Sequence, residues 1–563
     1  MKNKAVARLL YEIADFLEMQ DVEYKPRAYR RAARSVETLT DPIEDYHAED
    51  RLQDIDGVGD AIADKIAEYL DTGRLEYYEE LKEEVPVDVE ALTAVEGLGP
   101  KRVKQLYDAL GITDLDDLEE AAENGDIADV DGFGEKSQAS ILDHIGLARE
   151  GQERMLLGDV VPMVQELEEQ LAATEAFDRA EVVGSFRRRK PTIGDLDVLA
   201  TAPDRDAAMD AFCGLDDVTE VLSRGDTKSS IVLDDAVQVD LRIVEPSSWG
   251  AAILYFTGSK DHNVALRKRA QQRGWTLNEY GLREAGDSGE RVAGRTEEEI
   301  YAAFDMAFIP PELRENTGEL DAAENDGLPE LVETGEVRGD LQMHTEWSDG
   351  HASIREMAEA AAERGHDYIL VTDHGPSIAV TDGITSVEEL EEQRAAIEAV
   401  NNAVDVEVLQ GMEADITADG LDISRAMVDA VDLVVASIHN VPDDPTDAVL
   451  QAFADGADIW GHPTNRKIHE REPVDLDLDR VMAAAAEHGV AVEINAQPDR
   501  LDLDWQHVKQ YRDTVDFVVS TDAHRPQELG FMDLGVWQAR RGWLEQDDVL
   551  NTRPLDELQD WFS

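Results

Sequence analysis

The sequence predicts a multidomain protein in which an α-helical region, a mixed α/β region and a parallel β/α barrel follow one another. A turn of the form Gly-x-Gly followed by a helical pattern occurs three times in residues 1–150. Helical and strand patterns alternate in residues 151–316, and after residue 337 seven apolar strands alternate regularly with helices. Such regular alternation is typical of a parallel sheet closed into a barrel. A chain of 563 residues has room for roughly four domains.

The chain is strongly acidic, with 125 Asp and Glu residues against 52 Lys and Arg residues and a net charge of −73. At ordinary ionic strength this self-repulsion destabilises a compact state, whereas salt near 1 M shortens the Debye length to ~3 Å. Because the acidic residues are spread along the whole chain, we expect a protein from a high-salt cytoplasm. An acidic protein that binds basic partners is the alternative.

The composition also constrains the compartment. No apolar run approaches the ~18 residues that a membrane span requires, and the N-terminus lacks the apolar core of a signal peptide. The single cysteine, Cys213, excludes an internal disulfide framework and fits a reducing cytosol. We therefore expect a soluble, cytoplasmic protein that does not bind membranes. We also expect it to be a monomer.

Three short segments of the helical region share one pattern: an apolar residue stands between two glycines, and a helix is predicted to follow. Glycine permits a tight turn that brings backbone N–H groups close to an anion at the helix N-terminus. A helix-hairpin-helix binds a DNA phosphate in this way, without reading the base sequence. One such turn would also fit a plain helix–helix connection, but three predict DNA binding. The segments are "DIDGVGDAIADKI" (54–66), "VEGLGPKRVKQL" (95–106) and "VDGFGEKSQASI" (130–141), with Gly57, Gly59, Gly97, Gly99, Gly132 and Gly134 at the turns.

The mixed region contains a candidate metal site. Asp195 and Asp197 flank Leu196 on a predicted strand, so their carboxylates point to one face of the sheet. Asp240 in "VQVDLRIV" can join them from a neighbouring strand, and "GSFRRRK" (184–190) combines a turn with a basic run that suits a triphosphate. Carboxylates on one face repel one another unless cations lie between them, and two Mg²⁺ ions can clamp the attacking and leaving oxygens of a displacement. A solvated acidic face is the alternative.

These segments closely resemble the family X DNA polymerases. The resemblance rests on "GSFRRRK", "GDLDVL" (194–199), "VDLRIV" (239–244) and "YFTGSKDHNVALRKRAQQRGWTLNEYGL" (255–282), and it extends over residues 1–316. It implies a nucleotidyltransferase palm that fills short gaps in DNA during base excision repair. The implied cofactor is Mg²⁺ or Mn²⁺, and the implied partners are dNTPs and gapped or nicked double-stranded DNA.

The same resemblance assigns roles to individual residues. Asp195, Asp197 and Asp240 match the catalytic metal ligands. Ser185 and Arg188 match the residues that bind the triphosphate. The remaining matches lie near the phosphates, line the sugar pocket or contact the nascent base pair and the template: Gly184, Gly194, Tyr255, Phe256, Gly258, Asn263 and Arg267.

Lys65 in "GDAIADKI" (59–66) matches the lysine that forms a Schiff base in the family's deoxyribose-phosphate lyase. A lysine becomes nucleophilic when neighbouring cations lower its pKa. Ala61 stands where the family has a phosphate-binding lysine. A surface lysine on a helix is therefore the alternative.

The histidines are unevenly distributed, with three of the 13 before residue 338 and ten after it. Five of the ten follow predicted strands, and carboxylates accompany them. Active sites of parallel barrels form at the C-terminal ends of the strands, so these side chains should converge. Imidazole and carboxylate ligands together suit Zn²⁺ or Mn²⁺. The histidines are His344, His374, His439, His462 and His524, and the acids are Asp349, Asp373, Glu413, Glu493 and Asp522.

This half of the chain resembles the PHP (polymerase and histidinol phosphatase) domain, whose trinuclear site hydrolyses phosphoesters. The matching segments are "MHTEWSDG", "VTDH", "GMEADI", "ASIHN", "GHPT" and "STDAH", between residues 338 and about 530. The implied (β/α)7 barrel would hold its metals on His344, Asp349, His374, Glu413, His439, His462, Asp522 and His524.

Gln342 stands where the PHP motif begins with histidine. An amide oxygen binds Zn²⁺ or Mn²⁺ more weakly than imidazole does. A weakened 3′-5′ exonuclease or 3′-phosphatase and a purely structural metal site are both open at this point.

The whole chain is expected to be a gap-filling repair polymerase with a C-terminal PHP nuclease. One alternative is a DNA-end-binding scaffold with decayed metal sites, against which the three aspartates argue. A nucleotidyltransferase that acts on RNA or small molecules is another, against which the hairpins and "YFTGS" argue. The expected boundaries are residues 1–82 for a lyase-like helical domain, 83–150 for a further hairpin subdomain, 151–245 for the palm, 246–316 for a nucleotide-selection subdomain, 317–337 for a linker and 338–563 for the PHP domain.

Overall fold

The computed structural model describes residues 3–562 except 21, 23, 38–42, 49–50, 56, 96, 234–236, 286–288 and 377–382. The chain forms two compact units, Met1–Glu153 with His469–Arg471 and Arg154–Ile468 with Glu472–Ser563. Within the described ranges, no helix is both long and apolar enough to cross a membrane. The predicted order of a helical region, a mixed sheet and a parallel barrel is confirmed.

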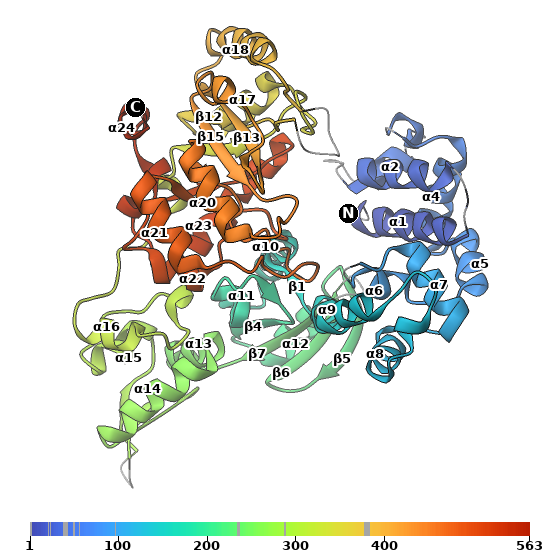
Figure 1. Cartoon of the computed structure of the whole chain (residues 1–563). Coiled ribbons are helices and arrows are strands. Elements are labelled where there is room, and N and C mark those ends of the chain that lie inside the picture. The colour runs from blue at the N-terminus through green and yellow to red at the C-terminus, as the bar shows by residue number, and fades with distance from the viewer. Residues whose placement is uncertain are drawn as a thin grey trace. The chain divides into compact units, whose positions relative to one another are not determined.

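The first unit is helical, as Figure 1 shows in blue to cyan. Apolar residues of its first helix recur every three or four positions, at Val6, Leu10, Ile13 and Leu17, so they lie on one face. That face joins an apolar core that continues through the unit as far as Ile145. The helices are α1 (Asn3–Met19), α2 (Lys25–Glu37), α3 (Ile43–Ala48), α4 (Asp60–Thr72), α5 (Glu76–Glu84), α6 (Val89–Thr93), α7 (Pro100–Leu110), α8 (Leu115–Asn124) and α9 (Glu135–Glu153).

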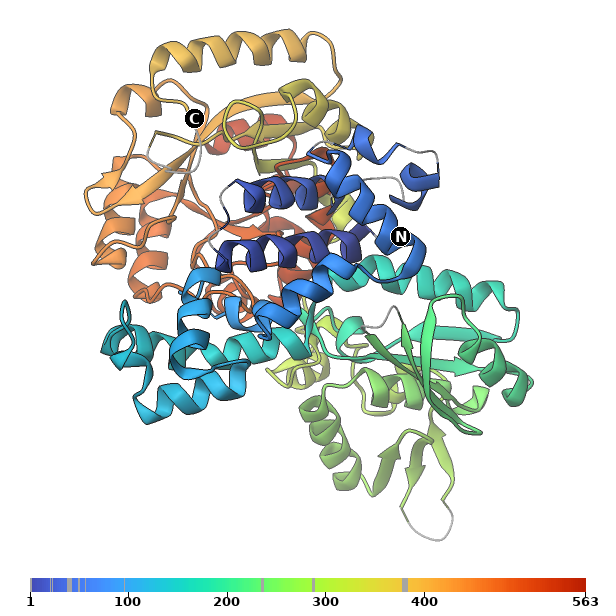
Figure 2. The same cartoon turned by 90° about the vertical axis from the view of Figure 1, so that its right-hand side faces the viewer.

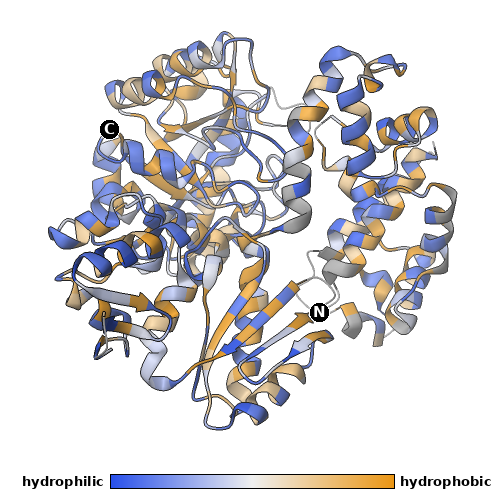
Figure 3. Ribbon diagram, turned by 90° about the horizontal axis from the view of Figure 1, so that it is seen from below, coloured by the Kyte–Doolittle hydropathy of each residue, from blue (hydrophilic) through white to orange (hydrophobic). Residues whose placement is uncertain are grey.

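The palm is a five-stranded sheet of order β2-β4-β7-β6-β5, in which β4 and β7 are parallel and the other neighbours antiparallel. Along β7 the buried Val239 and Leu241 alternate with Asp240 and Arg242, which is the period of a strand with one apolar face. Figure 3 shows this alternation of hydrophobic and hydrophilic residues along the strands. The elements are α10 (Leu157–Ala173), β2 (Arg179–Val182), α11 (Gly184–Arg187), β4 (Leu196–Thr201), α12 (Arg205–Cys213), β5 (Val218–Arg224), β6 (Lys228–Leu233) and β7 (Val237–Ile243), beside a short pair β1 (Met155–Leu156) and β3 (Thr192–Ile193).

Two helices and a small antiparallel sheet follow the palm. Helix α14 (Lys260–Gln272) lies beside β8 of this sheet, whose order is β10-β9-β8 (Figure 2). The segment 317–337, which was expected to be a polar linker, contains α16 (Glu319–Glu324), and Leu320 of this helix is buried in the local core. Part of that segment therefore packs against its neighbours. The other elements are α13 (Trp249–Thr257), β8 (Trp275–Asn278), β9 (Gly281–Glu284), β10 (Arg291–Ala293) and α15 (Glu297–Ala303).

The C-terminal part is a nearly closed parallel barrel with the strand order β11-β12-β13-β15-β16-β17-β18. A parallel bridge between Met343 and Ala523 brings the first strand beside the end of the last. The seven strands that the sequence predicts after residue 337 are present, and β14 (Gly420–Leu421) adds a short antiparallel partner to β13. The strands are β11 (Gly339–Met343), β12 (Tyr368–Val371), β13 (Glu407–Thr417), β15 (Leu433–Ser437), β16 (Ile459–Trp460), β17 (Ala491–Asn495) and β18 (Phe517–Ser520). The helices are α17 (Ile354–Glu363), α18 (Val387–Asn401), α19 (Arg425–Val428), α20 (Pro445–Asp455), α21 (Leu478–His488), α22 (Trp505–Tyr511), α23 (Met532–Arg541) and α24 (Leu555–Trp561).

The palm and the barrel share an apolar core. Leu501 and Leu534 of the barrel belong to the same cluster of buried side chains as the palm sheet and α10. Gly158 in α10 lies so close to the barrel that a Cβ atom there would be 2.7 Å from Pro498 Cβ and 3.0 Å from Leu534 Cδ1. A side chain at this position would push the two parts away from each other.

Candidate active sites

Two of the three predicted metal-binding carboxylates of the palm face each other across neighbouring strands. Asp197 on β4 and Asp240 on β7 are direct partners in the parallel register. Asp195 is exposed and immediately precedes β4. Burial, together with the Asp195 and Asp240 carboxylates, raises the pKa of Asp197 to about 6. The structure thus brings the three aspartates together, and their mutual repulsion favours a divalent cation with oxygen ligands between them.

A lysine that the sequence reasoning did not assign lies at this site. Lys228 Nζ on β6 is 2.5 Å from Asp240 Oδ2. Burial opposes ionisation of Asp240, but hydrogen bonds from Lys228, Ser230 and Gln238 outweigh it and lower the pKa of this carboxyl group. The pairing of β6 with β7 sets these contacts, and the polar residues of "KSSIVL" (228–233) gave no sign of that register.

A glycine turn begins the segment that is predicted to bind the triphosphate. Gly184 has a φ of 65°, and a Cβ atom there would lie 2.8 Å from Asp197 Oδ2. Glycine meets both demands, because it adopts positive φ freely and has no side chain to clash with the carboxylate. The turn therefore starts directly against the Asp197 carboxylate, and Ser185 lies in the first turn of α11.

The arginines that follow are held by the helices after the palm. Arg187 donates to Thr257 Oγ1 at 2.8 Å and to both carboxylate oxygens of Glu297, at 3.1 and 2.8 Å. Arg188 donates to the Thr257 carbonyl oxygen and, through Nε at 3.2 Å, to Glu315 Oε1. In this structure the predicted triphosphate-binding arginine therefore has protein acceptors on two sides.

The predicted sugar and base contacts lie on α13 and α14. Asn263 Nδ2 donates to the Tyr255 carbonyl oxygen at 2.8 Å, and Arg267 Nε donates to the Asn263 carbonyl oxygen at 3.2 Å. The rings of Tyr255 and Phe256 meet edge to face, with centroids 5.1 Å apart. Gly258 ends α13 with a φ of 76°. These side chains form one connected group, whereas Gly194 lies with the aspartates, just before β4.

The three predicted hairpins of the first unit have one geometry. In each, the first glycine has a positive φ: 75° at Gly57, 81° at Gly97 and 82° at Gly132. In each, a helix begins directly after the second glycine, so its first backbone N–H groups have no carbonyl partner within the helix. Such a helix N-terminus suits a phosphate. The second glycines Gly59, Gly99 and Gly134 precede α4, α7 and α9 respectively.

Lys65 lies on α4, in the first hairpin. Its Nζ donates to the Ala61 carbonyl oxygen at 3.3 Å and lies 4.6 Å from the centre of the Tyr77 ring. The helix and this ring account for the contacts of the amino group among the described residues. Its assignment as a Schiff-base nucleophile stays a prediction.

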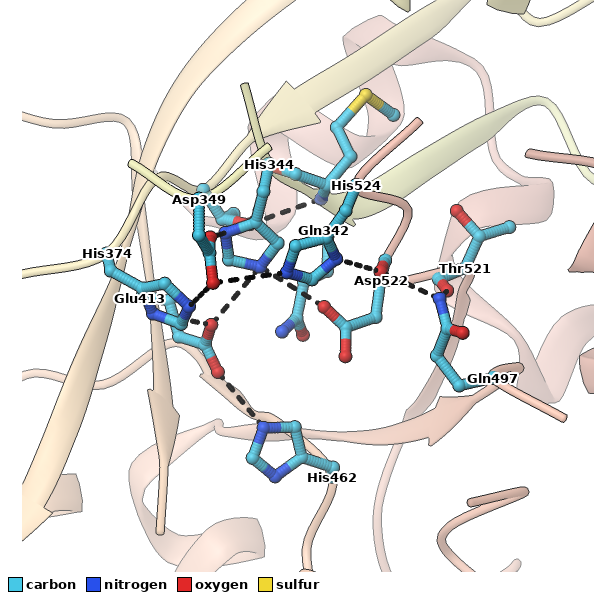
Figure 4. A network of polar contacts seen from close by, with 12 residues as sticks. Gln342, His344, Asp349, His374, Glu413, His462, Gln497, Thr521, Asp522 and His524 are labelled. Atoms are coloured by element: carbon cyan, nitrogen blue, oxygen red, sulfur yellow. Dashed lines mark hydrogen bonds and ion pairs between the residues drawn. The ribbon is translucent and has the colours of Figure 1, made fainter. Parts of the chain in front are cut away.

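The predicted metal ligands of the barrel converge at the C-terminal ends of its strands (Figure 4). One group of four side chains and one group of three each offer ligand atoms within 4.8 Å of one another, and His374 belongs to both. The first group is His344, Asp349, His374 and His524, and the second is His374, Glu413 and His439.

Glu413 lies at the centre of the cluster. Its carboxylate oxygens are 3.3 Å from His344 Nε2, 3.1 Å from His374 Nδ1, 3.6 Å from His439 Nε2 and 3.1 Å from His462 Nε2. Burial opposes ionisation of this carboxyl group, but the surrounding imidazoles outweigh it and hold its pKa well below the ordinary value. A fully buried carboxylate that touches four imidazoles would hold a divalent metal ion together with them.

Asp349 and Asp522 complete the cluster on opposite sides of His344. Asp349 lies 3.4 Å from His374 Nε2 and 3.5 Å from His524 Nε2, and Asp522 Oδ1 lies 3.1 Å from His344 Nε2. His344 is fully buried, and neither of its ring nitrogens has hydrogen-bond geometry with a described residue. Buried nitrogen atoms that face carboxylates without hydrogen bonds fit a bound divalent cation.

Gln342 extends into the same space. In the view of Figure 4, its amide points into the space between the carboxylates of Glu413 and Asp522. Gln342 is fully buried, and neither amide atom has a hydrogen-bond partner in the described part of the chain. An unpaired buried amide is costly, so its position favours an occupant of the space, which the amide oxygen can contact.

Two acids that accompany the histidines in the sequence have different roles. Asp373 accepts hydrogen bonds from Thr345 N at 2.8 Å, Thr345 Oγ1 at 2.7 Å and Ser348 Oγ at 2.6 Å, so it orders the loop after β11. Glu493 accepts from the backbone N–H of His462 at 2.6 Å. Sequence reasoning missed Asp415, which lies 3.4 Å from His439 Nδ1. Its place two residues after Glu413 on β13 was the available signal.

Comparisons with known proteins agree with this geometry. Family models match the chain in four places: a helix-hairpin-helix domain at residues 1–75, a tandem helix-hairpin-helix at 89–146, a DNA polymerase beta thumb at 252–315 and a PHP domain at 340–497. The chain is 35% identical over 570 residues to the DNA polymerase/3′-5′ exonuclease PolX of Bacillus subtilis, which covers 99% of both chains.

Two further relatives match one part of the chain each. DNA polymerase lambda of Rattus norvegicus is 26% identical over 343 residues, 56% of each chain. A probable phosphatase of Thermoanaerobacter is 29% identical over 235 residues, which is 38% of this chain and 90% of the phosphatase. The chain belongs to the family X DNA polymerases that carry a C-terminal PHP domain. Membership of this family implies divalent metal ions at both sites.

Proposed function

We propose that the chain is a DNA polymerase that fills short gaps in double-stranded DNA from dNTPs. The pairing of Asp197 with Asp240, with Asp195 close enough to raise the Asp197 pKa, carries this proposal. The primer 3′-hydroxyl attacks the α-phosphate of the dNTP, and pyrophosphate leaves. The PolX relative that matches along the whole chain supports the activity, and the three hairpins support DNA as the substrate.

The roles of the residues follow from their places. Asp195, Asp197 and Asp240 would hold Mg²⁺ or Mn²⁺, which when bound stabilises the charge that develops on the attacking and leaving oxygens. Ser185 and Arg188 bind the triphosphate, and they follow Gly184, at which a Cβ atom would lie 2.8 Å from Asp197 Oδ2. Tyr255 and Phe256 line the sugar of the dNTP. The hairpin glycines bind DNA phosphates through backbone N–H groups and thus without regard to sequence.

Incorporation of labelled dNTP tests the proposal. The protein is given Mg²⁺ or Mn²⁺ with three substrates: a gapped duplex, an RNA hairpin and free nucleotide. We expect extension of the gapped duplex alone, and a higher KM for dNTP in Arg188→Gln. Extension of the RNA would support an RNA nucleotidyltransferase, and binding of gapped DNA without any incorporation would support a scaffold.

We propose a second activity for the barrel: hydrolysis at a DNA 3′ end, as a 3′-5′ exonuclease or a 3′-phosphatase, with Zn²⁺ or Mn²⁺. The convergence of His344, His374 and Glu413 supports it, and so do relatives named as an exonuclease and as a probable phosphatase. Release of label from a 3′-labelled strand, compared between the wild type and His374→Ala, is the test. Equal release by both proteins would show that the hydrolysis does not come from the barrel site.

We also propose that the protein works near molar salt, because of its net charge of −73. A protein whose charged side chains contact 6–10 phosphates loses ~10³–10⁵-fold in DNA affinity when the salt concentration rises from 50 to 200 mM. The hairpins instead offer uncharged backbone groups. Thermal unfolding and dNTP incorporation measured from 0.1 to 3 M KCl test this. Maximal stability and activity at the lowest salt would contradict it.

A further inference from the structure

Helix α23 of the barrel reaches the triphosphate-binding segment of the palm. Arg541, at its C-terminal end, is 1% exposed and donates through Nη1 to the Arg188 carbonyl oxygen. Its Nη2 lies 3.3 Å from Glu315 Oε1. The barrel arginine therefore touches the predicted triphosphate binder through that residue's own backbone.

Glu315 connects the two arginines a second time. The same oxygen, Oε1, accepts from Arg188 Nε at 3.2 Å and from Arg541 Nη2 at 3.3 Å. All three side chains are largely buried, with exposed fractions of 12% for Arg188, 14% for Glu315 and 1% for Arg541. Charges in such a site are weakly screened, so each of them affects the free energy of the others strongly.

The next residue of the segment is also held by α23. The Arg189 guanidinium lies 4.0 Å from the centre of the Trp537 ring. Trp537 and Arg541 are four residues apart on α23, so both lie on the same face of the helix. Two consecutive residues of the basic run thus contact one helix face of the other domain. The close approach at Gly158 shows that this contact is part of a packed interface.

We propose that Arg541 is a positioning residue for the polymerase reaction, and that it prepares Arg188 to bind the triphosphate of the incoming dNTP. This inference rests on the proposed function, in which Arg188 is a triphosphate ligand. Arg541 fixes the backbone of Arg188, and it stays beside Glu315 as a cation when the Arg188 side chain turns toward the phosphates. The barrel thereby supports nucleotide binding in the palm, independently of its own hydrolytic site.

The electrostatics explain why a second cation is needed. Without Arg541, the cations near Glu315 would be Arg188, whose Nε lies 3.2 Å from it, and Lys190, on which it acts electrostatically. Of these two, Arg188 makes the hydrogen bond, so the triphosphate would have to compete with a buried carboxylate for the Arg188 guanidinium. A buried carboxylate left without its partner is strongly disfavoured. Loss of Arg541 should therefore weaken dNTP binding and raise the KM for dNTP, while kcat, which depends on the aspartates, changes less.

The chain offers a matched control in the neighbouring residue. Arg540 also crosses the interface from α23, but it donates to Glu312 Oε1 at 3.0 Å, Glu333 Oε1 at 2.7 Å and the Val332 carbonyl oxygen at 3.0 Å. None of these acceptors belongs to the basic run 187–190. Arg540→Met removes a charge and an interdomain contact of the same kind without touching Arg188.

The experiment measures KM and kcat for dNTP on gapped DNA with the full chain. We expect Arg541→Met to raise KM about tenfold with kcat within about threefold, and Arg540→Met to leave KM within about twofold. Adding Glu315→Gln to Arg541→Met should restore much of the lost affinity, because the competing carboxylate is then neutral. Arg541→Lys, which keeps the charge, should fall between the wild type and Arg541→Met.

Each outcome decides between the proposals. If Arg188→Gln raises KM but Arg541→Met does not, the positioning role is wrong and the proposed function stands. If Arg188→Gln leaves KM unchanged, the triphosphate assignment fails and the positioning role falls with it. Equal effects of Arg540→Met and Arg541→Met would mean general loss of domain contact and would overturn the inference. If thermal unfolding shows that Arg541→Met does not fold, Arg541→Lys and the double variant with Glu315→Gln still test the inference. A KM for Arg541→Lys equal to that of the wild type would contradict the positioning role. Failure of Glu315→Gln to restore dNTP affinity would also contradict it.

Discussion

The two candidate metal sites of this chain are built from opposite materials. The palm site consists of Asp195, Asp197 and Asp240. Asp195 is exposed, and Lys228 lies beside Asp240. In the barrel, the buried carboxylate of Glu413 is surrounded by imidazoles. Oxygen ligands in an open site suit a hard ion that keeps water and arrives with a phosphate, whereas nitrogen ligands in a closed site suit a resident, softer ion.

This difference shows which groups balance the charge of each site. In the palm, Lys228 contacts Asp240 in the structure, so part of the negative charge is already compensated before any metal binds. In the barrel, both ring nitrogens of His344 and the Nδ1 atoms of His374 and His462 are buried without hydrogen-bond partners among the described residues. The barrel site is therefore the one that should depend on metal for its structure, and the palm site the one that should depend on metal for its reaction alone.

The largest expected effect is on the palm. Asp197→Asn should lower dNTP incorporation by about 10³-fold or more, because it removes a carboxylate that interacts with both Asp195 and Asp240 and would hold the catalytic ions. Hydrolysis of a 3′-labelled strand and binding to gapped DNA should stay as in the wild type. Single-turnover extension of a gapped duplex measures incorporation, and fluorescence anisotropy measures binding to gapped DNA. Incorporation within tenfold of the wild type would show that Asp197 is not a metal ligand.

The complementary change is in the barrel. Glu413→Gln should reduce 3′-end hydrolysis by about 10²-fold and lower the bound metal by at least one ion, because it removes the charge that the surrounding imidazoles share. Metal analysis of the purified protein measures the bound metal directly and needs no activity assay. The kcat for dNTP incorporation should stay within about twofold of the wild type. Unchanged metal content would place the ions elsewhere, and a parallel loss of polymerase activity would break the separation of the two sites.

A gain of function is expected at Gln342. Gln342→His should raise metal affinity or 3′-end hydrolysis by about 10–100-fold, since it adds an imidazole to a buried space next to His344. Calorimetric titration of the metal-stripped protein with Mn²⁺ or Zn²⁺ measures the affinity. Gln342→Asn, which keeps an amide but shortens it, is the matched control and should not gain affinity. If the histidine variant gains neither metal nor activity, the amide does not limit this site.

Much of both sites could be predicted from the sequence because local patterns encode them. The strand alternation around Leu196 puts Asp195 and Asp197 on one face, and strand ends of a barrel converge whatever their order in the chain. Three repeats of Gly-x-Gly indicated the hairpins, and their positive φ values confirm the turn geometry. Each of these features depends on a few neighbouring residues, so periodicity and turn chemistry are enough to find it.

The contacts that join distant segments could not be predicted in this way. Glu315 is shared by Arg188 and Arg541, which are 353 positions apart in the chain, and no local pattern pairs them. Lys228 reaches Asp240 through the register of two strands. The segment 317–337 was interpreted as a linker because most of it is polar, yet Leu320 and Ala323 bury one side of a short helix. Tertiary packing decided these features.

The smallest expected effect concerns Asp458, which has a pKa of about 6, as Asp197 does, but for a different reason. Asp197 owes its value to burial and to neighbouring carboxylates, whereas burial alone raises the pKa of Asp458, which accepts a hydrogen bond from Val434 N at 2.8 Å. The folded state therefore binds the Asp458 proton more tightly than the unfolded state, whose pKa is near 3.8. Stability should fall as the pH rises from about 4 through 6, and it should change little below that window, where both states are protonated.

Asp458→Asn removes this pH-dependent loss and keeps the hydrogen bond, since its amide oxygen can accept from Val434 N. We expect the variant to be more stable than the wild type at pH 8 by about 1 kcal/mol, after allowing for partial solvent screening, and equal to it below pH 4. Thermal unfolding at constant molar KCl measures the difference. Mg²⁺ should raise the unfolding temperature of both proteins equally, because no carboxylate among the described residues acts on the Asp458 carboxyl group. Asp197→Asn, in contrast, should lose that Mg²⁺ response. An Mg²⁺ response that disappears in Asp458→Asn but persists in Asp197→Asn would reverse the assignment of the ion-binding carboxylate.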